Sequence, residues 1–187
     1  MARNKRRLAE KRSNFPKVLA IDLGGKTGWA ISWSDGSLTS GREKFVKAST
    51  KKHKETPGMR FLRFKDFLDK LDGADAVYYE EVHAHAGTDA AHAYGGFRAI
   101  LMEWAERNKI SYGSFGVGTI KKRATGKGNA KKPAMVKAAN EEVGKALGKI
   151  ITDDNEADSI WILILALEQM GLHWPGKKLC QKRQSSI

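Results

Sequence analysis

The sequence predicts an α/β fold in which a mixed five-stranded sheet carries helices on its faces. A length of 187 residues suits one domain, and a hydrophobic fraction of 41% is enough for a core, which excludes a fully disordered chain. The early apolar segments follow one another as strands joined by short turns, which favours antiparallel pairing. The later segments alternate between strand and helix, which favours parallel pairing.

Three strands are expected in the first part of the chain. Residues 18–23 form an apolar run that contains one acid, Asp22, and ends at a pair of glycines. Residues 27–33 read as a second strand, and the Asp-Gly pair within residues 34–37 is typical of a hairpin turn. A third strand runs to about Val46, so strands joined by hairpins open the domain.

Helices and strands alternate in the rest of the chain. Apolar residues recur at helical spacing over residues 59–71, and an Asp-Gly pair ends that segment. The expected helices span 59–71, 89–107, 133–147 and 154–170, and the expected strands span 76–82 and 110–115. A basic loop is expected before Pro133, because proline suits the first turn of a helix.

Both ends of the chain are expected to lie outside the folded domain. We divide the chain into a basic arm over residues 1–16, a folded domain over residues 17–171 and a basic tail over residues 172–187. The one cysteine, Cys180, excludes a disulfide scaffold and a Cys-rich zinc site. No P-loop is present, so no nucleotide cofactor is expected.

The lengths of the apolar segments also bear on the cellular compartment of the protein. The longest apolar run, residues 160–167, is far shorter than the stretch of about 20 residues that crosses a membrane. The first residues lack the apolar stretch of a signal peptide. We therefore expect a cytoplasmic protein with no membrane partner.

Positive charge is concentrated in two segments. The chain has 34 Lys and Arg against 21 Asp and Glu, a formal net charge of +13. Residues 1–17 carry seven basic residues and one acid, and residues 121–137 carry seven basic residues and no acid. Such density favours a polyanionic partner, usually nucleic acid. A solubilising arm explains the first segment equally well, whereas the turn at residues 125–128 shapes the second into a loop.

Acids inside apolar segments are the informative residues of so basic a chain. Asp22 lies near the end of one expected strand. Glu80 and Glu81 lie in another, where alternation lets only one of the two point toward a given face. Asp154 and Asp158 begin the last helix at a spacing that puts them on the same side.

Each of these acids alone has an ordinary structural interpretation. Asp22 could bond to nearby turn amides, the glutamates could pair with surface lysines, and acids in a first turn favour the helix dipole. If Asp22, Glu80 and Asp158 converge, each pair about 4 Å apart repels by about 4 kcal/mol, which calls for a cation. All-oxygen ligation suits Mg²⁺ or Mn²⁺, and a carboxylate-held metal pair beside a Lys-rich loop suits phosphodiester cleavage.

From about Lys17 to Leu167 the chain resembles the RuvC family of Holliday-junction resolvases, in the RNase H-like superfamily. The similar segments are, in order, the first catalytic strand, the strand with the catalytic glutamate, a Gly-containing dimer helix, the basic junction-binding loop and the acidic opening of the last helix. They span residues 21–28, 79–82, 94–98, 125–132 and 155–159. Sugar kinases and pre-ribosomal RNA nucleases have strands like the first, so the basic loop and the ordered acids are the more specific signals.

The resemblance implies an RNase H-like fold and a homodimer that binds branched DNA and cuts two strands of a four-way junction. It implies two Mg²⁺ ions per active site, with Mn²⁺ able to substitute, and in-line attack by water. The implied catalytic residues are Asp22, Glu80, Asp154, Asp158 and Lys132, of which the four acids would hold the metal. The implied DNA contacts are Lys121, Lys122, Lys127, Lys131, Lys132 and His83. The compact size and basic arm would suit a phage or prophage resolvase in a bacterial cytoplasm.

Two positions depart from the family pattern. Asn155 stands where the family has its other helix acid, so Asp154 or Glu156 would have to replace it. His83 stands where the family often has an aromatic residue that stacks on a base. The fourth metal-site residue therefore remains open between positions 154, 155 and 156.

Alternative functions also remain open. An RNase H-like nuclease acting on other branched DNA or on structured RNA would carry the same residues, because backbone and shape carry recognition in both cases. A non-catalytic junction-binding protein is the other alternative, and Asn155 supports it. The small helix face of Ala91, Gly95 and Ala99 fits a dimer seam, although internal packing would explain it equally well.

Overall fold

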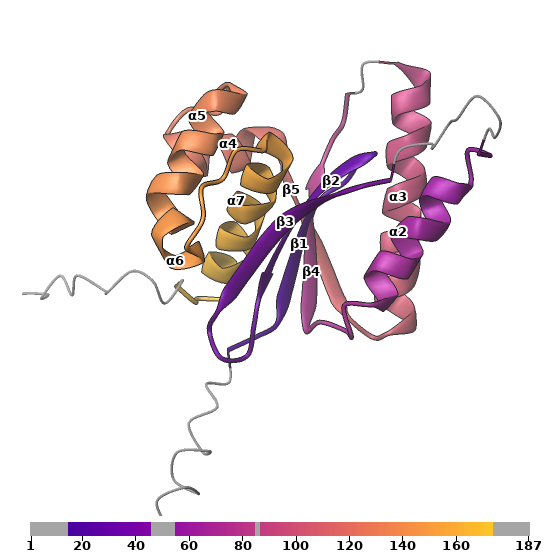
Figure 1. Ribbon diagram of the computed structural model, residues 1–187, viewed down its shortest axis with the longest axis horizontal. Coiled ribbons are helices and arrows are strands. Elements are labelled where there is room, and N and C mark those ends of the chain that lie inside the picture. The colour runs from indigo at the N-terminus through magenta and orange to yellow at the C-terminus, as the bar shows by residue number, and fades with distance from the viewer. Residues whose placement is uncertain (1–14, 46–54, 85–86, 174–187) are drawn as a thin grey trace, which may run out of the picture.

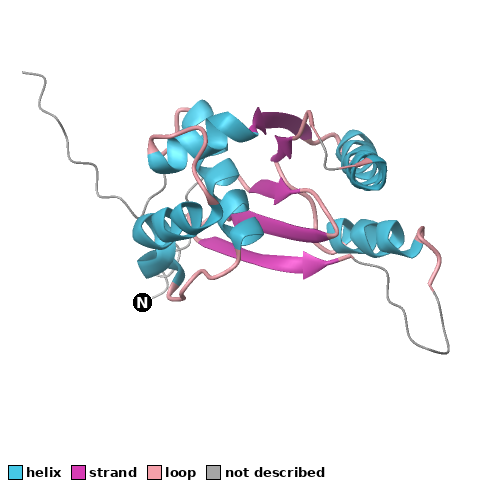
Figure 2. Cartoon of the chain, turned by 90° about the horizontal axis from the view of Figure 1, so that it is seen from above, coloured by secondary structure: helices cyan, strands magenta, loops and turns pink. Residues whose placement is uncertain are grey.

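The computed structural model describes residues 15–45, 55–84 and 87–173, and these form three layers (Figure 1). A central sheet has two helices on one face and a group of helices on the other, and the view along the layers shows the strands between them (Figure 2). The basic arm up to residue 14, the end of the third strand at Val46 and the tail from residue 174 lie outside the described residues.

All five expected strands are present. They are β1 (Val18–Asp22), β2 (Lys26–Ser32), β3 (Leu38–Lys44), β4 (Ala76–Glu81) and β5 (Ser111–Gly116). The sheet order is β3-β2-β1-β4-β5. The pairs β1–β2 and β2–β3 are antiparallel, whereas β1–β4 and β4–β5 are parallel. The predicted mixed sheet is therefore confirmed, and the carboxyl ends of β1, β4 and β5 meet at one edge.

Helices α2 (Met59–Asp69) and α3 (Thr88–Arg107) cover one face of the sheet. Alternate residues of β1 such as Leu19 and Ile21 point to this face and are fully buried there. Aromatic rings fill the layer, and Phe64 of α2 meets Phe97 of α3 edge to face at 5.1 Å between ring centroids. This half of the core fixes α3 against the sheet.

The opposite face is covered by α4 (Val117–Thr125), α5 (Lys132–Ala139), the π-helical turn η1 (Asn140–Gly144), α6 (Lys145–Leu147) and α7 (Asp154–Gln169). The apolar body of α7 packs on β1 and β2 and is buried from Ile160 to Ile164. Among the described helices, none is long and apolar enough to cross a membrane.

The expected helix 133–147 is present but contains the π-helical turn. Asn140, where that turn begins, clamps the loop before α7, because its side chain accepts from the Ile151 amide at 2.8 Å and donates to the Ile151 carbonyl at 2.7 Å. The side-chain amide also donates to the Val136 carbonyl at 3.0 Å. The turn thus ties the end of this helical segment to the approach to α7.

The prediction of a basic loop before Pro133 is wrong in part, because helix α4 occupies residues 117–125. Contacts with α7 stabilise this short helix more than its own residues do. Ile120 of α4 is buried in the core. Arg123 of α4 forms an ion pair with Glu168 of α7 and lies 5.4 Å from the centre of the Trp161 ring. Gly126 then ends the helix in a left-handed conformation, with φ of 77°.

Candidate functional site

Parallel pairing of β1 and β4 brings Asp22 and Glu80 to the same edge of the sheet. Ile21 pairs with Tyr79 in the register, so the two acids follow at the next position of each strand. Side chains alternate along a strand, and Tyr78 packs on the α7 side while Tyr79 packs on the α3 side. Asp22 and Glu80 therefore both face α7.

The choice between the two glutamates is settled by the partners of Glu81. Its carboxylate accepts from Ser114 Oγ at 2.7 Å and from Arg98 Nη2 at 3.3 Å. Glu81 thus takes part in contacts to β5 and α3, away from Asp22. Glu80 is the glutamate that joins the acidic cluster.

The amino-terminus of α7 brings Asp154 and Asp158 to the same edge. Asp153 caps the helix by accepting from the backbone amides of Asn155 at 3.1 Å and Glu156 at 3.2 Å. Burial raises the pKa of Asp153, but these hydrogen bonds and that from Arg42 outweigh it and lower the pKa. The first turn of α7 is thereby fixed with its acids toward β1 and β4.

Gly28 allows this close approach of α7 to β2. A Cβ atom added at Gly28 would lie only 1.8 Å from the backbone oxygen of Asn155. Any side chain at this position would push the first turn of α7 outward. The glycine therefore sets the distance between the acids of α7 and the acids of the strands.

The four acids Asp22, Glu80, Asp154 and Asp158 form what we call the acidic cluster. Burial raises the pKa of Asp22 well above its usual value, and the charges of Glu80 and Asp158 raise it further. A side-chain hydrogen bond with Glu80 also raises the pKa of Asp22. Burial likewise raises the pKa of Glu80, although Asp22, Lys121 and Lys132 oppose the shift.

Asp158 is the most exceptional member of the acidic cluster. Burial, followed by the charges of Glu80 and Asp154, raises its pKa to about 7. Its Oδ1 atom is buried and has no hydrogen-bond partner among the described residues. A buried oxygen without a partner costs about 1–3 kcal/mol, so this atom calls for a cation or a donor.

Two lysines face the acidic cluster from α4 and α5. Lys132 forms an ion pair with Asp154, and this hydrogen bond raises the lysine pKa. Lys121 and Lys132 both act to lower the pKa of Glu80 and of Asp158. The structure therefore brings these two predicted lysines to the predicted acids.

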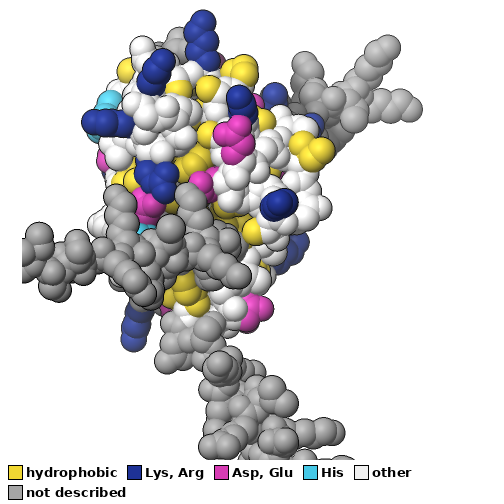
Figure 3. Space-filling model, turned by 90° about the vertical axis from the view of Figure 1, so that its left-hand side faces the viewer, with side chains coloured by type: hydrophobic (Ala, Val, Ile, Leu, Met, Phe, Trp, Pro, Cys, Tyr) yellow, Lys and Arg dark blue, Asp and Glu magenta, His cyan; other side chains and the backbone are white. Residues whose placement is uncertain are grey.

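The other predicted DNA contacts lie on the surface beyond this centre. Lys122, Lys127 and Lys131 are exposed on α4 and in the turn before α5, and His83 is exposed just after β4. Figure 3 shows the face on the α5 side, where Lys and Arg side chains project around a few acids. No contact with the acidic cluster is recorded for these four residues.

Glu156 is removed from the candidates for the fourth acid. It is only 8% exposed and accepts from Ser40 Oγ at 2.6 Å, and Lys149 forms an ion pair with it. Asn155 bonds instead to Asp153 Oδ1 at 3.3 Å. Of the residues at positions 154, 155 and 156, only Asp154 raises the pKa of Asp22 and of Asp158 through its charge. Spacing along the sequence gave no signal for the Ser40 and Lys149 contacts.

The donor set of the acidic cluster fits a hard divalent cation. No three or more His, Cys, Asp or Glu of the described chain are yet arranged as a complete metal site. Instead a side-chain hydrogen bond joins Asp22 and Glu80, Lys132 forms an ion pair with Asp154, and Asp158 Oδ1 has no described partner. Clustered carboxylate oxygens are the ligands that Mg²⁺ and Mn²⁺ prefer, and a bound cation would neutralise them in place of Lys132.

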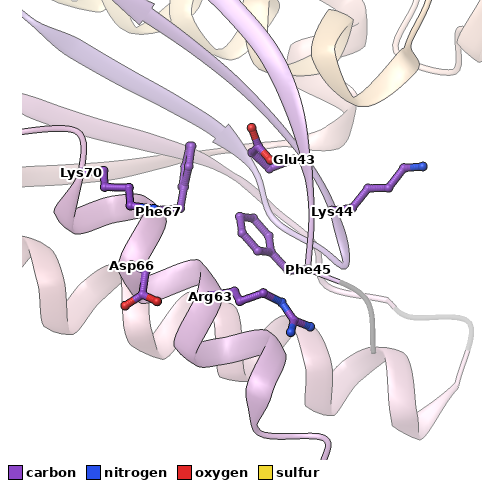
Figure 4. Close-up of a pocket in the computed structure, with 7 residues that line it drawn as sticks. All are labelled: Glu43, Lys44, Phe45, Arg63, Asp66, Phe67 and Lys70. Carbon is purple, nitrogen blue, oxygen red and sulfur yellow. The ribbon is translucent and has the colours of Figure 1, made fainter. Parts of the chain in front are cut away.

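Two grooves of the structure lie along α2, away from the acidic cluster. One, of about 320 Å³, lies between the end of β3 and α2 and has Phe45, Phe67 and charged side chains in its wall (Figure 4). The other, of about 340 Å³, lies between the start of α2 and α3 and includes Phe61 and His92. Neither groove is lined by a member of the acidic cluster.

Comparison with solved structures finds the same fold in junction resolvases. The structure of Thermus thermophilus RuvC in complex with a Holliday junction substrate matches with a TM-score of 0.64 and 18% identity, over 84% of this chain and 97% of that chain. Another T. thermophilus RuvC structure matches with a TM-score of 0.61 and 18% identity, over 82% of this chain and 96% of that chain. The yeast mitochondrial Holliday junction resolvase Ydc2 matches with a TM-score of 0.52 and 14% identity, over 84% of this chain and 80% of that chain.

Sequence comparison adds nothing to this likeness: no family model and no curated protein matches the chain. The structural likeness confirms the predicted RNase H-like fold, with three antiparallel strands followed by parallel ones and helices on both faces.

Proposed function

We propose that this chain is a metal-dependent endonuclease that resolves four-way DNA junctions. The observation that carries the proposal is the acidic cluster at the carboxyl edge of the sheet, opposed by Lys121 and Lys132, in a fold shared with junction resolvases. Clustered carboxylates that face lysines suit phosphodiester hydrolysis.

Asp22, Glu80, Asp154 and Asp158 would hold the metal, which we take to be a pair of Mg²⁺ ions replaceable by Mn²⁺. Bound metal would lower the pKa of the attacking water and stabilise the charge on the leaving oxygen. Asp158 supports this assignment, since burial and then the charges of Glu80 and Asp154 raise its pKa to about 7, and its Oδ1 atom has no partner among the described residues. Lys132, now paired with Asp154, would be released toward the phosphate.

The exposed lysines would position the junction. Lys121 lies near the acids, so it would contact the scissile phosphate, whereas Lys122, Lys127 and Lys131 would contact phosphates farther along the arms. His83 follows the strand of Glu80 and would lie against a base near the crossover. These contacts carry little sequence information, so recognition would depend mainly on junction shape.

A second copy of the chain would bind through α3. The residues of α3 that face the core are Tyr94, Phe97 and Leu101, so internal packing does not use the small face. Gly95 and Ala99 are exposed, and a Cβ atom added at Gly95 would meet nothing within 4 Å. A homodimer would supply one acidic cluster per cut strand, in the cytoplasm of a bacterial or phage-infected cell.

The proposal is tested with a four-way DNA junction, a linear duplex and a flap, each incubated with wild type and Asp22→Asn. We expect paired, symmetric nicks in the junction with Mg²⁺, and none with EDTA or with Asp22→Asn. Junction binding by Asp22→Asn should be retained, because removing a negative charge does not weaken attraction to phosphate.

Other outcomes would favour a different function. Preferential cleavage of flaps would identify a nuclease for other branched substrates. Tight junction binding by wild type without cleavage in Mg²⁺ or Mn²⁺ would contradict the enzyme assignment and leave a junction-binding protein.

A further inference from the structure

Helix α3 is bonded to the main chain of β4 at the catalytic glutamate. The Tyr94 hydroxyl donates to the Glu80 carbonyl oxygen at 2.8 Å and accepts from the Val82 amide at 3.2 Å. The tyrosine is only 8% exposed, and burial raises its pKa, so the hydroxyl is neutral and able to donate. One hydroxyl therefore bridges the residues on both sides of Glu81.

The bridge lies where the sheet ceases to hold the strand. β4 ends at Glu81, so the Val82 amide comes after the last residue of the strand. A backbone group near the end of a strand needs another partner, and here a side chain supplies it. Because the Tyr94 ring is in the α3 layer and the Glu80 side chain faces α7, the hydroxyl holds the main chain from the face opposite the acidic cluster.

A second side chain of α3 strengthens the same attachment. Arg98, one turn after Tyr94, donates to Tyr79 Oη at 3.1 Å and to Glu81 Oε1 at 3.3 Å. Its guanidinium also lies 5.6 Å from the centre of the Tyr79 ring. Both neighbours of Glu80 in the chain are thus held from α3.

We propose that Tyr94 is a positioning residue for Glu80, fixing where the glutamate carboxylate meets the metal. The inference rests on the proposed metal role of the acidic cluster. Groups that orient a metal ligand typically change metal affinity or activity by about 10–100-fold when removed. The Tyr94 hydroxyl lies on the face of β4 opposite the acidic cluster, so its effect would act through the backbone of Glu80.

The test compares Tyr94→Phe with wild type and with Tyr112→Phe. Phenylalanine keeps the ring in the core and removes only the hydroxyl. Tyr112 is the matched control, because it is 41% exposed on β5 and its hydroxyl bonds to Glu106, away from the cluster. Mn²⁺ affinity is measured by calorimetry without DNA, and junction affinity is measured in EDTA.

We expect Tyr94→Phe to weaken Mn²⁺ binding by about tenfold and to raise the Mg²⁺ concentration for half-maximal cleavage by a similar factor. Junction affinity in EDTA should not change, and Tyr112→Phe should match wild type throughout. Wild-type Mn²⁺ affinity in Tyr94→Phe, with only a lower melting temperature, would overturn the inference and leave a structural hydroxyl.

A second variant keeps the inference testable if Tyr94→Phe does not fold. If Tyr94→Phe does not fold, Arg98→Gln removes the guanidinium from Tyr79 and Glu81 and is expected to weaken Mn²⁺ binding in the same direction. Unchanged Mn²⁺ affinity in Arg98→Gln would then count against positioning from α3. Failure of the proposed function gives a different result, since wild type would then bind Mn²⁺ but would not resolve the four-way junction.

Discussion

The Asp158 carboxyl is protonated in the folded chain at pH values where it would be ionised in the unfolded chain. Its pKa is about 7 when folded, against a usual 3.8. Between these values the native state binds more protons, so the free energy of unfolding falls as pH rises through this window. The shift corresponds to about 4 kcal/mol lost by neutral pH when no metal is bound.

We therefore expect Asp158→Asn to stabilise the metal-free protein. In EDTA the melting temperature of wild type should fall between about pH 4 and about pH 7, and that of Asp158→Asn should fall less, so the variant is the more stable at and above neutral pH. Asp22 has a raised pKa as well, so some pH dependence remains in the variant. Differential scanning calorimetry measures both, and parallel pH profiles would rule out the assigned role of Asp158.

The residues of the acidic cluster show how far sequence reasoning reaches. Asp22, Asp158 and the pair Glu80 and Glu81 could be selected because acids in apolar segments are costly and stand out, and the family resemblance pointed to Glu80 within the pair. The fourth acid could not be selected from the sequence. The choice among Asp154, Asn155 and Glu156 depends on the direction in which the first turn of α7 points each side chain. One partner of Glu156 is Ser40, 116 residues earlier, and no local pattern reveals such a contact.

At the scale of elements, the first turn of α7 depends on the missing side chain of Gly28. We expect Gly28→Ala to destabilise the fold by about 1–3 kcal/mol and to weaken Mn²⁺ binding, because the new methyl group would displace Asp154 and Asp158. Gly118→Ala in α4 is the control, since a Cβ atom there meets nothing within 4 Å. Urea unfolding and calorimetry measure the two effects, and wild-type Mn²⁺ affinity in Gly28→Ala would show that α7 is not held by this contact.

The five strands and most helices could be predicted because their apolar periods are long and their turns are marked. Helix α4 could not be predicted, since it has only nine residues and its stability comes from the contacts of Ile120 and Arg123 with distant parts of the chain. The sequence does show that basic residues are concentrated between residues 121 and 137. Their division between α4, a turn and α5 depends on tertiary contacts.

For the whole molecule, the charge distribution predicts how binding responds to salt. We expect junction affinity to fall steeply with salt, and Lys127→Gln and Lys131→Gln each to reduce the slope of log affinity against log salt by about 1. Lys109→Gln is the control, because Lys109 precedes β5 at the end of the sheet away from the acidic cluster. Titrations at several salt concentrations give the slopes, and equal slopes for all three variants would place the DNA elsewhere.

Lys149 has a further consequence for how copies of this protein can associate. It is tied to Glu156 and also donates to the Ser40 carbonyl at 2.7 Å, on the outermost strand β3. An open outer strand invites pairing with a strand of another molecule, and a lysine there discourages it. The anchored ammonium therefore disfavours strand addition at this edge of the sheet.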